Sequence, residues 1–161
     1  MEYSAIPLFK SHYSLGKSIL TLAKAGSSEA DEPSSIIDIA KKLNLENLHL
    51  VVDSISGFLE AYKSCEDAKL NLRFGLRLTV CDDIENKTAD SREKEHKIIV
   101  FATNTSGYYD LIKISTLASI DGFYYYPRID CKNLKKLWNE NNLMLCVPFY
   151  GSYVFKNNLT H

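Results

Sequence analysis

The stretch LHLVVDSISGFLEAYKSCEDAKLNLRFGLRLTV, residues 48–80, predicts a strand, a helix and a second strand in close succession. LHLVVD (48–53) is a nearly continuous apolar run that ends in an acid, which fits a strand buried on both faces. SGFLEAYKSCEDAK (56–69) has apolar residues at helical spacing, and LRFGLRLTV (72–80) alternates in the manner of a strand with one polar side. This order favours an α/β fold.

The residues before this stretch predict one more strand and two more helices. SAIPLF (4–9) reads as a short strand, and GKSILTLAKAG (16–26) carries apolar residues at mixed helical spacing with a glycine stop. The polar segment SSEADEP (27–33) reads as a solvated loop. The serine pair 34–35 precedes the apolar stripe of residues 36–43, which predicts a short helix with a serine cap.

The alternation continues after residue 80. The charged segment, residues 81–96 (CDDIENKTADSREKEH), is expected to be a solvated excursion. The later elements are expected to be a strand at 97–103, a helix from 107 with caps at 104–106, a helix after the cap Asp130, and a strand at 143–149. Strand and helix alternate five times, which predicts a parallel α/β sheet or barrel.

Composition limits the classes of protein that the chain can represent. With 161 residues, 45% hydrophobic residues and a net charge of -1, residues 1–161 are expected to form a single domain that bulk charge does not draw onto nucleic acid. Four scattered cysteines without a CxxC pair predict reduced thiols. The N-terminus lacks a signal-peptide core and no apolar run is long enough for a bilayer, so a cytoplasmic protein is expected.

Several segments resemble the N-terminal PHP domain (polymerase and histidinol phosphatase) of bacterial and phage family C replicative DNA polymerases, the polymerase III alpha subunit. The resemblance is carried by HYSLGKSIL (12–20), SGFLEAYKSCEDAKLNLRFGLRLTV (56–80), ATNTSGYYDLIKISTLAS (102–119) and GFYYYPRID (122–130). It implies a PHP-like (β/α) barrel, here partial or reduced, with parallel strands. It also implies a parent family of DNA-directed DNA polymerases, which are nucleotidyltransferases of DNA replication.

The run DGFYYYPRID (121–130) concentrates aromatic surface in one place. The resemblance implies a surface-crossing connection between barrel elements. The residues themselves favour Phe123 and the tyrosines filling the space beneath it, with the hydroxyls reaching water. The alternative is an aromatic platform for stacking bases, which needs a basic groove beside it. Arg128 is expected to be the only nearby cation, so the space-filling interpretation is favoured.

The resemblance further implies a metal cluster whose ligands lie at strand ends, because phosphodiester hydrolysis needs an activated water. Family members with an intact site have a His-x-His-x-His pattern before the Tyr-Ser of the first loop. Here the corresponding letters are IPLFKSH (6–12), with Ile6 and Lys10 at histidine positions. An apolar side chain cannot ligate, and an ammonium group is only a donor.

The second and third motifs also depart from the family pattern. Thr-Asp-His is replaced by Val52-Asp53-Ser54, and Gly-x-Glu by Gly75-Leu76-Arg77. We therefore expect the degenerate positions Ile6, Lys10, His12, Asp53, Ser54 and Arg77 to bind no metal and no other cofactor. Lys10, Arg77 and Asp53 could form a buried ion-paired network, or the two cations could point outward. His12 is a single imidazole without a second ligand at metal spacing.

Other catalytic patterns are lacking: the sequence contains neither a GxSxG elbow nor a GxxxxGK[ST] phosphate loop. The favoured hypothesis is a metal-free, non-catalytic PHP segment that scaffolds a replicative polymerase. Its partners would be the rest of the polymerase chain and replisome subunits, with DNA contacted only indirectly and no membrane. One alternative is a metal-dependent phosphoesterase or 3'-5' proofreading exonuclease that uses His12, Asp53 and Asp82. A second alternative is a stand-alone interaction module.

Overall fold

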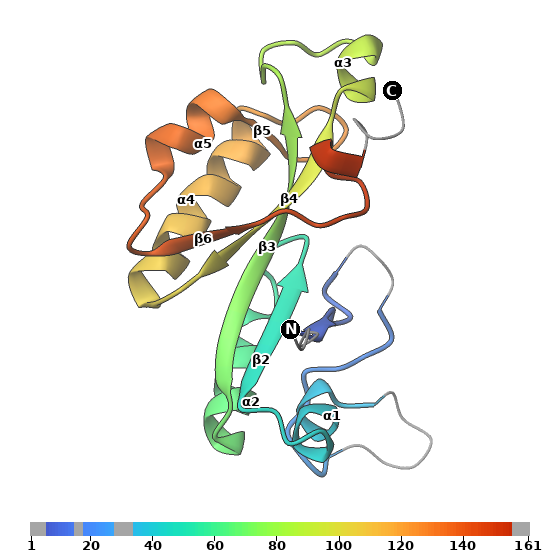
Figure 1. The fold of residues 1–161 in the computed structure, drawn as a ribbon, viewed down its shortest axis with the longest axis vertical. Coiled ribbons are helices and arrows are strands. Elements are labelled where there is room, and N and C mark those ends of the chain that lie inside the picture. Colours follow the sequence, from blue (N-terminus) through green and yellow to red (C-terminus); the bar gives the residue numbers. More distant parts are fainter. Residues whose placement is uncertain (1–5, 15–17, 28–33, 156–161) are drawn as a thin grey trace, which may run out of the picture. The chain divides into compact units, whose positions relative to one another are not determined.

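The computed structural model describes residues 6–14, 18–27 and 34–155. The chain divides into two compact units, Met1–Gly75 and Leu76–His161. Strand β3 (Asn71–Cys81) begins in the first unit and continues into the second (Figure 1). Helices and strands alternate along the described chain, which confirms the α/β class.

Unit 1 is a small sheet with two helices. Its elements are β1 (Leu8–Phe9), α1 (Ile36–Lys42), β2 (Asn47–Val52), α2 (Phe58–Ala68) and the start of β3. β2 lies between β1 and β3, and β1 pairs with β2 in parallel, with Leu8 opposite His49. The fully buried side chains of the core include Leu22, Ile36, Ile37, Leu48 and Leu50.

The strand, helix and strand predicted from residues 48–80 are confirmed as β2, α2 and β3. The serine cap of α1 is confirmed as well. The Ser35 hydroxyl accepts hydrogen bonds from the backbone N–H groups of Ile37 and Asp38, at 3.1 and 3.4 Å. These bonds satisfy donors that the first turn of a helix leaves without intrahelical partners.

The helix predicted for residues 16–26 is wrong for the part that the structure describes. Residues 18–26 contain no helix, and Thr21 instead forms an isolated parallel bridge with Ser35. The Thr21 N–H donates to the Ser34 carbonyl at 3.1 Å, and the Thr21 carbonyl accepts from the Ile36 N–H at 3.0 Å. Pairing with a distant segment thus uses the backbone groups that a helix would have bonded internally.

Unit 2 carries the rest of β3 and the remaining elements. These are α3 (Ala89–Glu93), β4 (His96–Ala102), α4 (Thr105–Ile120), β5 (Arg128–Asp130), α5 (Cys131–Leu137) and β6 (Leu143–Cys146). β3 has β4 and β5 as neighbours, and β6 lies beyond β4. The core includes Leu76, Val80, Val100, Leu111, Ile114 and Ile129.

The predicted N-terminal caps of α4 and α5 in unit 2 are confirmed. The side chain of Asn104 accepts from the Gly107 N–H at 2.9 Å, so α4 begins where the Asn-Thr-Ser run predicted. The Asp130 carboxylate accepts from the Asn133 N–H at 2.7 Å at the start of α5. Both side chains replace helix-end hydrogen bonds that would otherwise need water.

The direction of β6 corrects the expectation of parallel strands throughout. β5, a strand that the sequence did not predict, pairs with β3 in parallel, but β6 pairs with β4 antiparallel, with Ala102 opposite Leu143. The reason lies in the turn before β6. The Asn142 carbonyl accepts from the Thr103 N–H at 2.9 Å, and the Asn142 side chain donates to Asp110 of α4 at 2.9 Å. The turn is therefore held at the end of β4, and β6 can only run back along it.

The charged segment is more ordered than the solvated excursion that the sequence predicted. Residues 89–93 form α3, whose cap is Thr88. Ser91 and Glu95 are buried, with exposed fractions of 9% and 7%. The charge-rich composition of the segment did not indicate that these two side chains are buried, because most of their neighbours in the segment are exposed.

All four cysteines are free thiols, as predicted. Burial raises the pKa of both Cys65 and Cys81 to about 11, so these two thiols are protonated and unreactive at neutral pH. In the described part of the chain, every helix is too short or too polar to cross a bilayer.

Packing of α4 against the turn before β6 predicts a strong effect of one added methyl group. A Cβ atom at Gly107 would overlap with the Asn142 carbonyl oxygen, which is backbone and cannot move aside cheaply. We expect Gly107→Ala to lower the free energy of unfolding by about 1–3 kcal/mol, despite the better helix propensity of alanine. Chemical denaturation measures this. Ser106→Ala, at the neighbouring exposed position, is the matched control, and equal effects of the two variants would contradict the prediction.

Candidate functional site

The first loop, residues 10–14, and Asp53 follow the carboxyl ends of two neighbouring strands. Phe9 of β1 lies opposite Leu50 of β2 in a parallel pair, so the chain leaves both strands at the same edge. Lys10 and Asp53 are both half-buried there. Ligand sites of open α/β sheets occur at this edge, so the position agrees with the motif positions identified from the sequence.

Asp53 is bound by a serine that the sequence analysis did not single out. The Ser14 hydroxyl donates to Oδ2 of Asp53 at 2.7 Å, and Ser14 itself is only 5% exposed. The Ser14 N–H donates to the Ser11 carbonyl at 2.9 Å, which turns the first loop back toward β2. The surviving carboxylate of the second motif therefore holds the first loop. Ser14 belongs to the Tyr-Ser pair of the resemblance, and that pair was the available signal.

Tyr13 and His12 lie on the outside of the same loop. The Tyr13 hydroxyl donates to Oε2 of Glu60 on α2 at 2.8 Å, and this bond raises the pKa of Tyr13. Gly57, which precedes α2 with φ of 83°, leaves the space that the Tyr13 ring needs, because a Cβ atom there would overlap with the ring. His12 is exposed, and its ring centroid lies 4.1 Å from that of Tyr13.

The other predicted positions do not present metal-binding groups together. Ile6 is 62% exposed, and the Lys10 carbonyl accepts from the Ser18 hydroxyl at 2.5 Å. The Ser54 hydroxyl accepts from the Ser56 N–H at 3.3 Å. Arg77 is half-buried on the part of β3 that belongs to unit 2. An ion pair between Asp53 and Lys10 or Arg77 stays a prediction.

The donor set at these positions does not fit the metal cluster that the resemblance implies. Isoleucine, lysine and arginine cannot ligate a cation, which leaves one carboxylate, one exposed imidazole and hydroxyl groups. Among residues 6–14, 18–27 and 34–155, no three histidine, cysteine, aspartate or glutamate side chains are grouped closely enough to hold a metal ion. We therefore derive no step through a metal.

Asp82, a ligand in the alternative hypothesis, lies in unit 2 and is exposed. Its carboxylate lies 3.9 Å from Nζ of Lys94. It borders an open polar hollow of about 680 Å³ that also contains Asp83, Glu85, Lys87, Asp121, Asp130, Lys132 and Lys136. Lysines are interspersed with the acids, so the hollow is not a one-sign cation site.

Arg128 is the centre of a second polar cluster, and this one is buried. Its side chain is fully buried, and Nη1 lies 3.4 Å from Oε1 of Glu95. The guanidinium also donates to the carbonyls of Gly122, Asn86 and Ile84, at 3.1, 3.2 and 3.2 Å. One side chain of β5 thus binds both the charged segment and the start of the tyrosine loop, residues 121–127.

The tyrosine loop closes over this ion pair. The Tyr124 ring centroid lies 5.0 Å from Cζ of Arg128, and the Tyr126 hydroxyl donates to Glu95. Burial, together with the bond to Glu95, raises the pKa of Tyr126. Tyr125 differs: it has φ of 62° and is 69% exposed. The space-filling interpretation therefore agrees with Tyr124 and Tyr126 and fails for Tyr125 and for Phe123, which is 50% exposed.

Two expectations about this run need correction. Its end is not a surface connection, because Arg128, Ile129 and Asp130 form the buried strand β5. Arg128 is also not the only nearby cation. Cζ of Arg92 lies 4.9 Å from the Tyr125 ring centroid, and Nζ of Lys97 lies 5.5 Å from that of Tyr126. Both cations come from parts of the chain that are distant in sequence, which is why the local sequence did not show them.

The chain belongs to the PHP domain family, whose model matches residues 10–153. Curated relatives are named DNA polymerase III subunit alpha. The one from Borreliella burgdorferi is 30% identical over 106 residues, which cover 64% of this chain and 9% of the relative. Those from Helicobacter pylori and Chlamydia trachomatis are 30% and 34% identical over 80 residues each, covering 50% and 48% of this chain. The chain spans less than a tenth of the length of these relatives.

The burial of the Arg128–Glu95 pair predicts a large loss of stability on its removal. Arg128→Met leaves the Glu95 carboxylate buried without its guanidinium, and we expect a loss of about 3–5 kcal/mol in the free energy of unfolding. Arg92→Met, which removes an exposed arginine beside the same loop, should cost only about 0–1 kcal/mol. Urea denaturation of both variants measures the difference. Losses of similar size would show that the buried pair contributes no more than a surface contact.

Proposed function

We propose that this chain is a non-catalytic, metal-free PHP segment that acts as a scaffold within a replicative DNA polymerase, in the cytoplasm. The observation that carries the proposal is the chemistry of the motif positions. Ile6, Lys10 and Arg77 stand where the family pattern has ligands, and the surviving carboxylate of Asp53 accepts a hydrogen bond from Ser14. A carboxylate that holds a loop contributes to stability without any turnover.

The partners that we propose are the rest of a polymerase chain and replisome subunits. The relatives named above are DNA polymerase III alpha subunits, of which this chain matches a small part. Direct binding of DNA is not proposed, because the net charge is -1 and the polar hollow of unit 2 mixes acids with lysines. The buried Arg128–Glu95 pair favours a rigid support over a mobile domain.

Two alternative functions make different demands on the chain from those of the proposed scaffold. A metal-dependent phosphoesterase or proofreading exonuclease would need Asp53 as a ligand, together with groups such as His12 and Asp82. A stand-alone interaction module on the PHP fold would need the same surfaces as the scaffold but no polymerase. The exposed apolar side chains of β6 favour an interaction role in either case, since half of each of Met144 and Leu145 remains accessible.

We expect protein purified without chelator to contain less than one equivalent of zinc or manganese. In the presence of added manganese, hydrolysis of a nitrophenyl phosphodiester and of single-stranded DNA should be equal for the wild type and for Asp53→Ala. The reason is that the donor types at the motif positions cannot complete a metal site. Elemental analysis and product release measure the two quantities.

The control for this experiment is Asp90→Ala, which removes an exposed acid far from the motif positions in sequence. Stoichiometric metal that is lost in Asp53→Ala and kept in Asp90→Ala would refute the scaffold and support the hydrolase. Hydrolysis that is lost in Asp53→Ala and kept in Asp90→Ala would likewise refute the scaffold and support the hydrolase.

A further inference from the structure

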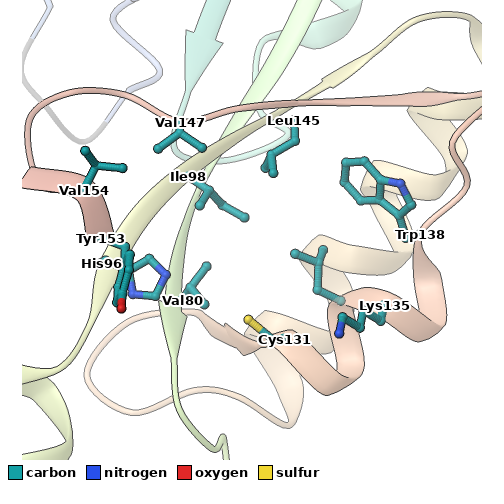
Figure 2. A pocket seen from close by; sticks show the side chains of 11 residues that line it. Val80, His96, Ile98, Cys131, Lys135, Trp138, Leu145, Val147, Tyr153 and Val154 are labelled. Atoms are coloured by element: carbon teal, nitrogen blue, oxygen red, sulfur yellow. The ribbon is translucent and has the colours of Figure 1, made fainter. Parts of the chain in front are cut away.

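Unit 2 has an apolar groove between its sheet and α5, with a volume of about 620 Å³. Its lining includes Val80 of β3 and Ile98 of β4, which are buried, and Leu145 and Val147, each 49% exposed. Trp138, which follows α5, lies on one side of the central space, across from Tyr153 and His96 (Figure 2). Large apolar side chains therefore surround an open space in place of a packed neighbour.

The groove is a place on a sheet face that a helix would normally cover. Leu145 and Val147 are two residues apart, as are His96 and Ile98, and such residues point to the same face of a sheet. Faces of mostly parallel α/β sheets are covered by helices that lie side by side. α5 occupies one such position, and the groove is the open position beside it. The shape therefore suits a helix.

The strand that borders the groove lacks the charged side chains that commonly protect a sheet edge. β6 has β4 as its only neighbour among the described strands. Residues 141–155 contain no charged side chain, although charged residues commonly protect edge strands. Phe149 and Tyr150 are 72% and 80% exposed. Several large apolar side chains exposed in one short segment are typical of an interaction site.

The charges around the groove indicate the character of its occupant. Lys135 lines it and no carboxylate does, whereas Lys132 and Lys136 of α5 line the polar hollow described above. A helix with acidic side chains beside its apolar face would complement this rim. A second copy of the chain fits less well, because neither the groove lining nor residues 141–155 would bring a carboxylate to Lys135. The lining also lacks the convergent polar groups that small-molecule sites use.

We propose that the groove is a docking site for an amphipathic helix of a partner polypeptide, with a leucine-rich face and glutamates or aspartates along its border. This inference rests on the scaffold function proposed above, since it specifies the surface and the partner chemistry of that scaffold. The partner helix would place its apolar side chains over Ile98 and Leu145 and its carboxylates near Lys135. Apolar burial would supply affinity, and Lys135 would supply orientation.

Trp138 makes the proposal directly testable. It is the single tryptophan of the sequence and lines the groove, so its fluorescence reports on occupancy. The probes are two synthetic helical peptides of about 18 residues without tryptophan or tyrosine. They share one leucine face, and their polar border is glutamate in one and lysine in the other. With the full chain at low salt, we expect the glutamate peptide to shift Trp138 emission saturably to shorter wavelength and to bind about tenfold more tightly than the lysine peptide.

Three variants locate the binding. Leu145→Glu should weaken binding of the glutamate peptide at least about tenfold, and Lys135→Glu should reverse the preference between the peptides. Ile120→Glu, at an exposed apolar position that does not line the groove, should bind like the wild type. Circular dichroism confirms that each variant is folded. If Leu145→Glu does not fold, Val154→Glu at the other end of the groove replaces it.

The opposite results would overturn the proposal. These are the absence of a saturable emission change, equal binding of both peptides, or unchanged binding by Leu145→Glu. A concentration-dependent dimer in sedimentation that Leu145→Glu abolishes would assign the groove to a second copy. An emission shift with phosphatidylserine vesicles but with neither peptide would assign it to a membrane surface. None of these measurements depends on hydrolysis or metal content, so failure here is distinguishable from failure of the scaffold function.

Discussion

The second unit depends on one buried ion pair, between Arg128 and Glu95. A guanidinium in the interior is tolerated only when its donors are satisfied, and Arg128 meets this demand with a carboxylate and three backbone carbonyls. That demand brings together a short strand, a charge-rich segment and a tyrosine loop that share no sequence pattern. The rings of Tyr124 and Tyr126 then lie against the pair, which accounts for two of the aromatic side chains in this loop.

Local patterns predicted the elements whose causes are local. The buried strand ending at Asp53, the serine cap of α1 and the asparagine cap of α4 each depend on a few neighbouring residues, and each was correct. Predictions failed where distant segments decided the outcome. Residues 18–26 pair with the backbone around Ser35, and the turn at Asn142 is held by α4, which reverses β6. The composition of residues 81–96 likewise could not reveal that Glu95 has a buried partner at residue 128.

The sequence predicted which residues lie at the candidate site, but not the contacts that they make. Comparison of motif positions pointed to Lys10 and Asp53, and both lie at the carboxyl edge of β1 and β2. The bond from Ser14 to Asp53 depends on how the first loop turns, and no spacing in the sequence encodes that turn. The Asp53 carboxylate is part of the framework of the first loop.

The uncharged edge strand β6 also has a consequence for the abundance of the protein in a cell. A strand with open backbone groups and no charge can pair with similar strands of unrelated or partly folded molecules, which is the first step of β-aggregation. Molecules made in excess of whatever covers this edge would be the ones exposed to chaperones and proteases. The abundance of the protein would then follow the supply of its partner more than the rate of its own synthesis.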